Sequence, residues 1–213
     1  MPKGNFQKFF SLGFFFLIIN YSISSNSSEF IKSINTYGVP GIIDMPVAGS
    51  FTDGELGFTY SKHGPNLRNT LTFQALPMVT GAFRYSGVGD RNLLFIESGY
   101  SNWDRSFDLR VDVLKQSKYV PDITVGLQDF IGTGMYSAEY LVASKSIFNT
   151  IRFTTGLGWG RLSTRSDSIV GKNGNRNSVR SDLGGSLNYK RFFRGPVSSF
   201  SAVEFQTPLK GLR

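Results

Sequence analysis

The feature that most constrains this sequence is an alternation of apolar and polar residues that recurs from about residue 50 onward. In residues 151–159, one parity carries Ile151, Phe153, Thr155, Leu157 and Trp159, and the other carries Arg152, Thr154, Gly156 and Gly158. A period of two indicates β-strands. The polar parity is rich in Gly, Ser, Thr, Asn and Gln, so it suits a wet interior while the other parity faces apolar surroundings, as in the wall of a membrane barrel.

Nine segments are predicted to be strands: residues 55–62, 70–75, 78–86, 106–115, 119–130, 136–146, 150–164, 181–193 and 198–207. Short segments containing Gly, Pro, Asn or Asp separate most of them, which is typical of an antiparallel meander. The predicted fold is therefore all-β: an antiparallel up-and-down meander that forms all or part of an outer-membrane β-barrel, after a cleaved signal peptide.

Each predicted strand has an apolar and a polar parity. The apolar parity includes Phe58, Leu71, Phe83, Phe107, Val125, Tyr136, Tyr140, Val142 and Tyr189. The polar parity includes Arg84, Asp108, Arg110, Asp112, Gln128, Glu139, Arg152 and Lys190. Alternation alone leaves two architectures open, because the apolar side can face lipid outside a barrel or form the core of a soluble β-sandwich or lipocalin-like binding module.

The amino terminus has the pattern of a secretory signal. Lys3 and Lys8 precede an apolar run over residues 9–19, and the small residues Ser22, Ser24 and Ser25 follow. The run is too short for a transmembrane helix, so we expect cleavage and secretion. The predicted organisation is a signal peptide over residues 1–27 and one β-barrel domain over residues 28–213.

Composition narrows the chemistry further. The 213 residues contain no cysteine, which excludes disulfides, thiolate metal sites and a lipid-modified cysteine anchor within them. The formal net charge is +8. On a secreted chain, such an excess favours acidic glycans or lipopolysaccharide phosphates as partners over nucleic acid.

Motifs that could carry bond-making chemistry are scarce. Gly156, Gly158 and Gly160 resemble a phosphate loop in spacing, but no helix and no Lys-Ser/Thr pair follow, so a smooth strand surface is favoured. Asp108 and Asp112 share a strand face with Arg110, which favours a salt-bridge ladder over a pair of catalytic carboxylates. We expect no enzyme, no cofactor and no bound metal.

Five residues are candidates for contact with a glycan. Arg84, Arg110, Arg152 and Lys190 would project from the polar parity into a lumen that an anionic polymer could cross. Trp103, in a predicted loop over residues 101–105, offers an aromatic face for sugar stacking beside planar hydrogen-bonding groups. A second polar loop, over residues 167–180, could contact lipopolysaccharide or simply be solvated.

Several segments together resemble one family in amino-acid sequence, order and spacing. They are Asn35-Thr36-Tyr37-Gly38-Val39-Pro40-Gly41-Ile42-Ile43-Asp44-Met45-Pro46, Leu71-Thr72-Phe73-Gln74-Ala75-Leu76-Pro77, Asp104-Arg105-Ser106-Phe107-Asp108, and the stretches 126–134, 140–145 and 156–162. The chain resembles the YjbH-like family of outer-membrane proteins associated with exopolysaccharide and capsule biosynthesis in Gram-negative bacteria, which implies a location in the outer membrane of such a bacterium. The resemblance implies a non-enzymatic barrel that works with outer-membrane lipid and lipopolysaccharide, an anionic exopolysaccharide and other envelope polysaccharide-export proteins.

One departure from the family concerns length. Members of this family are longer than this chain, which ends at Arg213 rather than at an aromatic residue closing a last strand. We therefore expect the chain to correspond to the amino-terminal portion of the family architecture, with its barrel domain truncated at the C-terminus.

Overall fold

The computed structural model describes residues 32–89, 100–147, 150–163, 170–176, 186–187 and 189–207. The predicted signal peptide, residues 1–27, lies outside these ranges. No helix in the described residues is long and apolar enough to cross a membrane.

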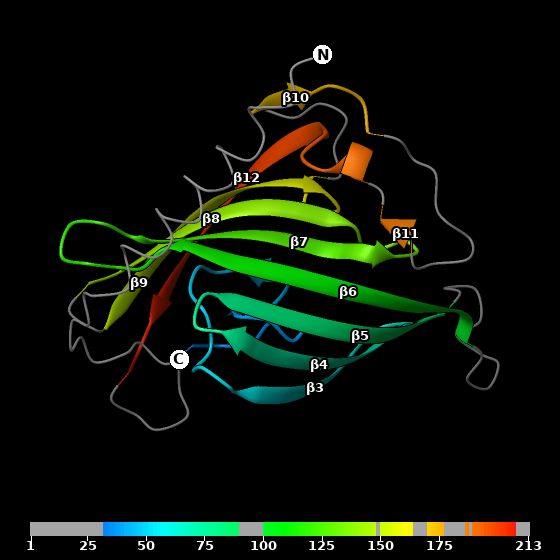
Figure 1. Cartoon of the computed structure of the whole chain (residues 1–213), viewed down its shortest axis with the longest axis horizontal. Helices are drawn as coiled ribbons and strands as arrows, with labels where there is room; N and C mark the ends of the chain where they lie inside the picture. The colour runs from blue at the N-terminus through cyan, green and yellow to red at the C-terminus, as the bar shows by residue number, and fades with distance from the viewer. Residues whose placement is uncertain are drawn as a thin grey trace, which may run out of the picture.

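One large antiparallel sheet dominates the structure (Figure 1). Its strands are β3 (Leu56–His63), β4 (Asn66–Leu76), β5 (Val79–Gly89), β6 (Tyr100–Leu114), β7 (Asp122–Gly132), β8 (Ala138–Ile147), β9 (Ile151–Gly160), β10 (Gly171–Asn173), β11 (Ser186–Leu187) and β12 (Gly195–Phe205). From β3 to β9 each strand pairs with the next along the chain; β12 then pairs with β9, β10 with β12, and β11 with β7. The predicted all-β antiparallel meander is confirmed.

Eight of the nine predicted strands are present, with bounds that differ by a few residues. The prediction of a strand over residues 181–193 is wrong for the residues that the structure describes, which form the short β11 and a 3-10 helix, η3 (Tyr189–Arg191). The reason lies in the pairing of its neighbours. β12 pairs directly with β9, with Ala202 opposite Thr154, so no position remains between them for another strand.

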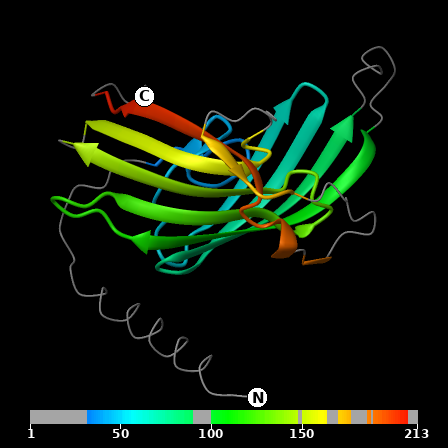
Figure 2. The ribbon, with the colours of Figure 1, turned by 90° about the horizontal axis from the view of Figure 1, so that it is seen from above.

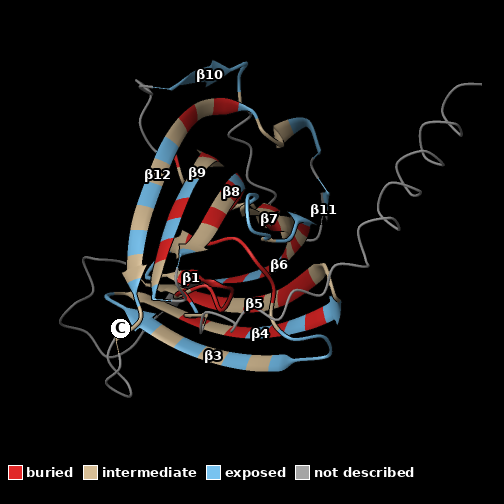
Figure 3. Ribbon diagram, turned by 90° about the vertical axis from the view of Figure 1, so that its left-hand side faces the viewer, coloured by how far each residue is buried: buried red, intermediate tan, exposed pale blue. Residues whose placement is uncertain are grey.

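The sheet is curved and open. Figure 3 shows its strands bending around an interior, and Figure 2 shows the same strands from above. Among the described residues, no strand pairs β3 at one edge with β10 or β12 at the other. The described residues therefore form a curved wall, and the predicted closure into a barrel is not found in them.

The register sets every residue on one of two faces. Phe58, Leu71, Phe83 and Phe107 occupy adjacent positions across four strands of the outer, convex face. Thr70, Arg84 and Ser106 form the neighbouring row on the inner, concave face. The outer row is partly or largely exposed and the inner row is buried, which gives the banded strands of Figure 3.

The faces of β8 are the reverse of the prediction. Tyr140 and Val142 lie on the inner face, opposite Gly126 and Thr124 of β7, and both are buried. The sequence 138–145 is apolar on both parities except at its ends, and Glu139 and Lys145 at those ends suggested a polar inner face. Both side chains instead belong to the outer parity, where they bind groups beyond the strand ends.

A segment outside the large sheet occupies the concave side. Residues 33–50, which we call the inner segment, contain β1 (Gly41–Ile42) and β2 (Met45–Pro46), which pair only with each other. In Figure 3 the sheet curves around β1. Gly38 has a φ of 80°, and a Cβ there would lie 2.7 Å from the Cβ of Thr70, so glycine permits this close approach to the wall.

Candidate functional site

The inner face of the sheet is the candidate site, because charged and hydroxyl side chains are concentrated there and are buried. They include Arg68, Thr70, Thr72, Thr80, Arg84, Asp104, Asp108, Arg110, Asp112, Thr124, Ser144 and Arg152. A buried charge is costly unless hydrogen bonds or an opposite charge compensate it. The partners of these side chains therefore define what the site can do.

Two arginines bind backbone carbonyl groups of the inner segment. Arg110 donates from Nη1 to the carbonyl of Pro40 at 2.8 Å, and from Nη2 to those of Val47 at 2.6 Å and Gly49 at 3.0 Å. Arg152 donates to the carbonyl of Ala48. These guanidinium groups thus hold the segment by its backbone oxygens.

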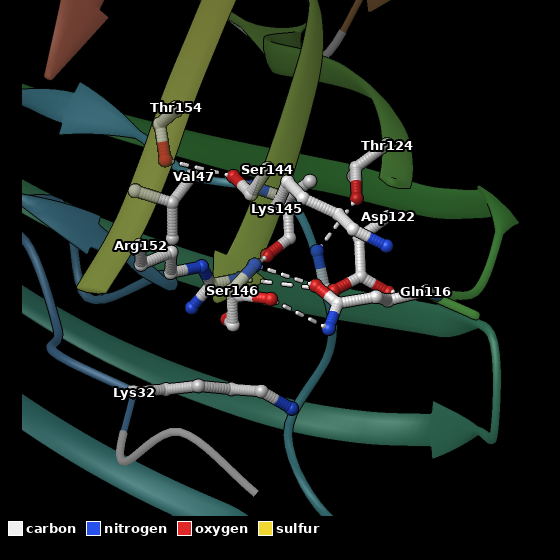
Figure 4. A network of polar contacts seen from close by, with 12 residues as sticks. Lys32, Val47, Gln116, Asp122, Thr124, Ser144, Lys145, Ser146, Arg152 and Thr154 are labelled. Atoms are coloured by element: carbon white, nitrogen blue, oxygen red, sulfur yellow. Dashed lines mark hydrogen bonds and ion pairs between the residues drawn. The ribbon is translucent and has the colours of Figure 1, made fainter. Parts of the chain in front are cut away.

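Hydroxyl groups of the sheet bind the same segment. Thr124 accepts the backbone N–H of Gly49 and Ser144 accepts that of Ala48, both at 2.9 Å, while Thr72 donates to the carbonyl of Gly38 at 2.6 Å. Ser144 also contacts Thr154 on the adjacent strand, with 2.8 Å between their oxygens (Figure 4). Because these contacts use backbone groups, they fix the path of the segment and place little restriction on the identity of its side chains.

Arg84 is held differently. It makes a bidentate ion pair with Asp108 at 2.7 and 3.0 Å and also donates to Ser106 at 2.9 Å. Asp108 further accepts the backbone N–H of Asp129. The predicted ladder of Asp108, Arg110 and Asp112 along one strand is therefore wrong for Asp108, which pairs across strands with Arg84 while Arg110 reaches the inner segment.

An aromatic pair joins the inner segment to the wall near one end of the sheet. The rings of Tyr37 and Tyr136 meet edge to face with 6.0 Å between centroids. Arg68, Arg84 and Arg161 lie 4.4, 4.9 and 4.6 Å from the Tyr37 ring. Burial raises the pKa of Tyr136, in the turn after β7, although Arg68 opposes the shift, so this ring stays neutral and offers its π-face to the cations.

Some buried polar atoms of the inner face have no hydrogen-bond partner within the described part of the protein. They are Oγ of Ser86, Oδ2 of Asp104, Nε2 of Gln128 and Oδ1 of Asp129. An unsatisfied buried polar group typically costs about 1–3 kcal/mol. These atoms leave part of the inner face with hydrogen-bonding capacity that the described residues do not use.

The structure places the five predicted glycan contacts in three different settings. Arg84, Arg110 and Arg152 lie together on the inner face, as the alternation predicted, and their contact with a glycan stays a prediction. Lys190 is exposed in η3 instead of projecting from a strand. Trp103 lies in β6, opposite Gly87, because the alternation continues through residues predicted to form a loop.

Trp103 belongs to an aromatic cluster on the outer face. Its ring stacks on Tyr85 with 4.8 Å between centroids and 12° between planes, and Arg105 lies 5.8 Å from the Tyr85 ring. Because the flat face of Trp103 meets a neighbouring ring, a glycan would have to compete with Tyr85 for that face.

The predicted polar loop over residues 167–180 is partly described, and one of its residues is anchored. Arg176 donates to both carboxylate oxygens of Glu139, at 2.5 and 3.0 Å, and to Ser137 at 2.7 Å. Glu139 also accepts the backbone N–H of Phe193. Arg176 is therefore committed to a buried ion pair that fastens this region to β8.

Two further findings concern the glycine motif and possible metal ligands. Gly156 and Gly158 lie within the ladder of β9, as the strand interpretation predicted. No cluster of three or more His, Asp or Glu side chains suited to a metal ion occurs among the described residues.

Sequence reasoning missed the inner segment as part of the site. Its residues supply much of the buried apolar surface, with Tyr37 and Val39 in one cluster and Ala48 in another. A signal was present, because a Gly- and Pro-rich stretch with isolated apolar residues precedes the first long strand. No periodicity, however, shows against which face such a stretch packs.

Comparisons with known proteins add an independent finding. Residues 33–213 match the family model YjbH, described as exopolysaccharide biosynthesis protein YbjH. The chain is 34% identical over 190 residues to the uncharacterized lipoprotein YjbH of Escherichia coli strain K12, covering 85% of this chain and 27% of that protein. The chain thus spans about a quarter of the length of this relative. No solved structure matches the chain.

Proposed function

Because this chain belongs to the YjbH family of exopolysaccharide biosynthesis proteins, we propose that it forms a section of a membrane-embedded wall through which, or beside which, an exopolysaccharide is assembled or exported. The observation that carries the proposal is the arrangement of the sheet. Its outer face is apolar and its inner face is polar.

The outer face presents large apolar side chains over many strands. Those exposed by 40% or more include Leu56, Phe58, Leu71, Phe73, Phe107, Leu141, Phe153, Val203 and Phe205. A continuous apolar surface of this kind needs a partner, and the hydrocarbon of a bilayer suits one that follows a curved antiparallel sheet. The stacked Tyr85 and Trp103 suit the aromatic region at a membrane interface.

The soluble alternative requires the opposite arrangement of faces. In a β-sandwich or a lipocalin-like module, the apolar parity is the buried core and the polar parity faces water. Here Phe58 is 69% exposed while Arg84 has no exposed surface. This contrast favours the membrane wall over a soluble binding module.

The open edges define what the wall needs in order to be stable in lipid. Unpaired backbone groups are not tolerated in the hydrocarbon region, so β3 and the β10–β12 edge must pair with further strands. We propose that these strands come from other parts of a longer envelope protein, in keeping with the greater length of the E. coli relative.

The location and partners follow from the same reasoning. A lipoprotein relative is consistent with a Gram-negative envelope location, and we assign this chain to the outer membrane. Outer-membrane lipid and lipopolysaccharide would contact the outer face, and other polysaccharide-export proteins would contact its ends. The proposed role is transport or scaffolding and needs no catalysis, cofactor or metal.

Cell fractionation tests the proposal. Inner and outer membranes of cells expressing the protein are separated on a density gradient, and the chain is followed with an antibody. Recovery in the outer-membrane fraction, released only by detergent and with heat-modifiable gel migration, supports a membrane wall. Release with the soluble periplasm contradicts it.

A further inference from the structure

We propose that the inner face is a binding site for an anionic carbohydrate chain and that the inner segment occupies this site as a displaceable surrogate. The inference rests on the proposed function and deepens it by naming the ligand class and its position. It depends on three observations: the groups that hold the inner segment, the buried polar atoms of the inner face that have no hydrogen-bond partner, and the lack of backbone pairing between β1 or β2 and the large sheet.

Arg110 and Arg84 differ in the acceptors of their hydrogen bonds. All the hydrogen bonds described for Arg110 end on neutral carbonyl oxygens of the inner segment, at Pro40, Val47 and Gly49. Arg84, by contrast, has a full carboxylate partner in Asp108. Hydrogen bonds between a guanidinium and a carboxylate are stronger than those to a neutral acceptor, so a uronate carboxylate can compete for Arg110.

The lining of the inner face is chemically mixed. Hydroxyl, amide, carboxylate and guanidinium groups alternate over the inner face, and Tyr136 and Tyr140 provide aromatic rings beside them. This mixture of planar hydrogen-bonding groups and aromatic faces suits a sugar chain. Ser86, Asp104 and Gln128 also keep buried polar atoms that the inner segment does not satisfy and that sugar hydroxyls could bind.

The inner segment is not part of the backbone ladder of the large sheet. β1 and β2 pair only with each other, and the ladder from β3 through β12 does not include them. The inner segment can therefore leave without breaking a backbone hydrogen bond of the sheet's ladder. Apolar residues of the inner segment join two small clusters, one around Tyr37 and one around Ala48, and the hydrogen bonds to the wall described above also hold it.

A reversible disulfide, which we call a lock, tests the proposal. The 213 residues contain no native cysteine, so no other thiol of the chain competes with the introduced pair. Ala48→Cys with Ser144→Cys joins the inner segment to β8, where the native Ser144 oxygen lies 2.9 Å from the Ala48 nitrogen. The matched control is Ala143→Cys with Thr155→Cys, which joins facing positions of β8 and β9 on the outer face of the wall. Loss of free thiols reports closure of each disulfide.

The readout is binding of fluorescent alginate oligomers, a polyuronate, to each full-chain variant, with dextran of equal length as the neutral probe. We expect oxidation of the inner-segment lock to weaken alginate binding about tenfold or more and reduction to restore it. We expect the wall lock to bind alginate in both redox states. Restoration on reduction shows that the locked protein is folded.

Three results would overturn the proposal. Alginate binding that is absent from the reduced protein, or unaffected by the inner-segment lock, shows that the inner face is not the site. Equal binding of dextran refutes an anionic ligand. Cell fractionation does not depend on alginate binding. The proposed membrane wall is therefore tested separately from this binding site.

A second set of variants tests the arginines without a disulfide. Arg110→Gln with Arg152→Gln removes the two cations that bind backbone carbonyl groups of the inner segment, and we expect it to weaken alginate binding about tenfold. Lys172→Gln, on the exposed strand β10, removes one cation away from the inner face and should leave binding unchanged. Equal effects of both variants would indicate nonspecific charge attraction and contradict the site.

Discussion

Arg152 and Phe153 are neighbours on β9, yet Arg152 is 2% exposed and Phe153 is 47% exposed. The same contrast separates the inner and outer faces across the sheet. In a soluble protein the apolar face would be the buried one. The inner face is stabilised by ion pairs and hydrogen bonds, several of them to the inner segment, whereas the proposed function places the outer face against lipid, which supplies no hydrogen bonds.

The largest expected effect concerns the buried ion pair of the inner face. Arg84→Met leaves Asp108 as a buried charge without its partner, so we expect the free energy of unfolding to fall by about 3–5 kcal/mol. Removing both charges with Arg84→Met and Asp108→Leu should recover most of this loss. Urea titration in detergent measures both variants, and equal damage from the single and double replacements would argue against charge pairing.

The next effect concerns the outer face. Leu141 lies on β8 between Val125 and Leu157 of the adjacent strands. Leu141→Arg places a charge in the proposed hydrocarbon region and should cost about 2–4 kcal/mol if the site is near the midplane. Leu141→Phe, which stays apolar, is the matched control. Equal assembly of both variants into vesicles would place this face outside lipid.

A smaller effect compares two glycines that both face inward. A Cβ at Gly126 would lie 2.1 Å from Cζ of the buried Tyr140 ring, whereas a Cβ at Gly57 meets nothing within 4 Å. We expect Gly126→Ala to lower the free energy of unfolding by about 1–3 kcal/mol, as for other overpacked sites. Gly57→Ala should change it by at most about 0.5 kcal/mol, the range of uncrowded positions. Similar values for both would mean that Tyr140 does not cover Gly126.

The smallest expected effect concerns the aromatic cluster of the outer face. Tyr85 and Trp103 stack with 4.8 Å between ring centroids. A double-mutant cycle with Tyr85→Leu and Trp103→Leu should give a coupling energy of about 0.5–1.5 kcal/mol. A coupling indistinguishable from zero would show that the two rings act independently.

Much of the sheet could be predicted because alternation reports a physical boundary. Along β4, β5 and β6, one parity meets the outer surroundings and the other meets the polar interior, so sequence and register agree. The same rule failed at Trp103 because the neighbouring Asn102, Asp104 and Arg105 suggested a loop. In the structure, Asp104 is an inner-face residue and Trp103 an outer-face residue of one continuous strand.

The inner segment and the faces of β8 could not be predicted from alternation. Tyr140 can face inward because Gly126 leaves room for its ring and Ala48 packs beside it. Both partners are distant in sequence, and a single strand contains no information about them. Similarly, Arg110 was expected to pair with Asp108 on its own strand. Its acceptors are instead backbone carbonyl groups of the inner segment, about 60 to 70 residues away in the sequence.

The central claim is that the apolar outer face meets lipid and the polar inner face does not. Spin labels on single cysteines at each of residues 151–158, in the chain reconstituted in phospholipid vesicles, test it directly through collisions with oxygen and with a water-soluble nickel complex. The account predicts a period of two, with oxygen accessibility highest at Phe153, Thr155 and Leu157. Maximal nickel accessibility at those three positions would contradict it.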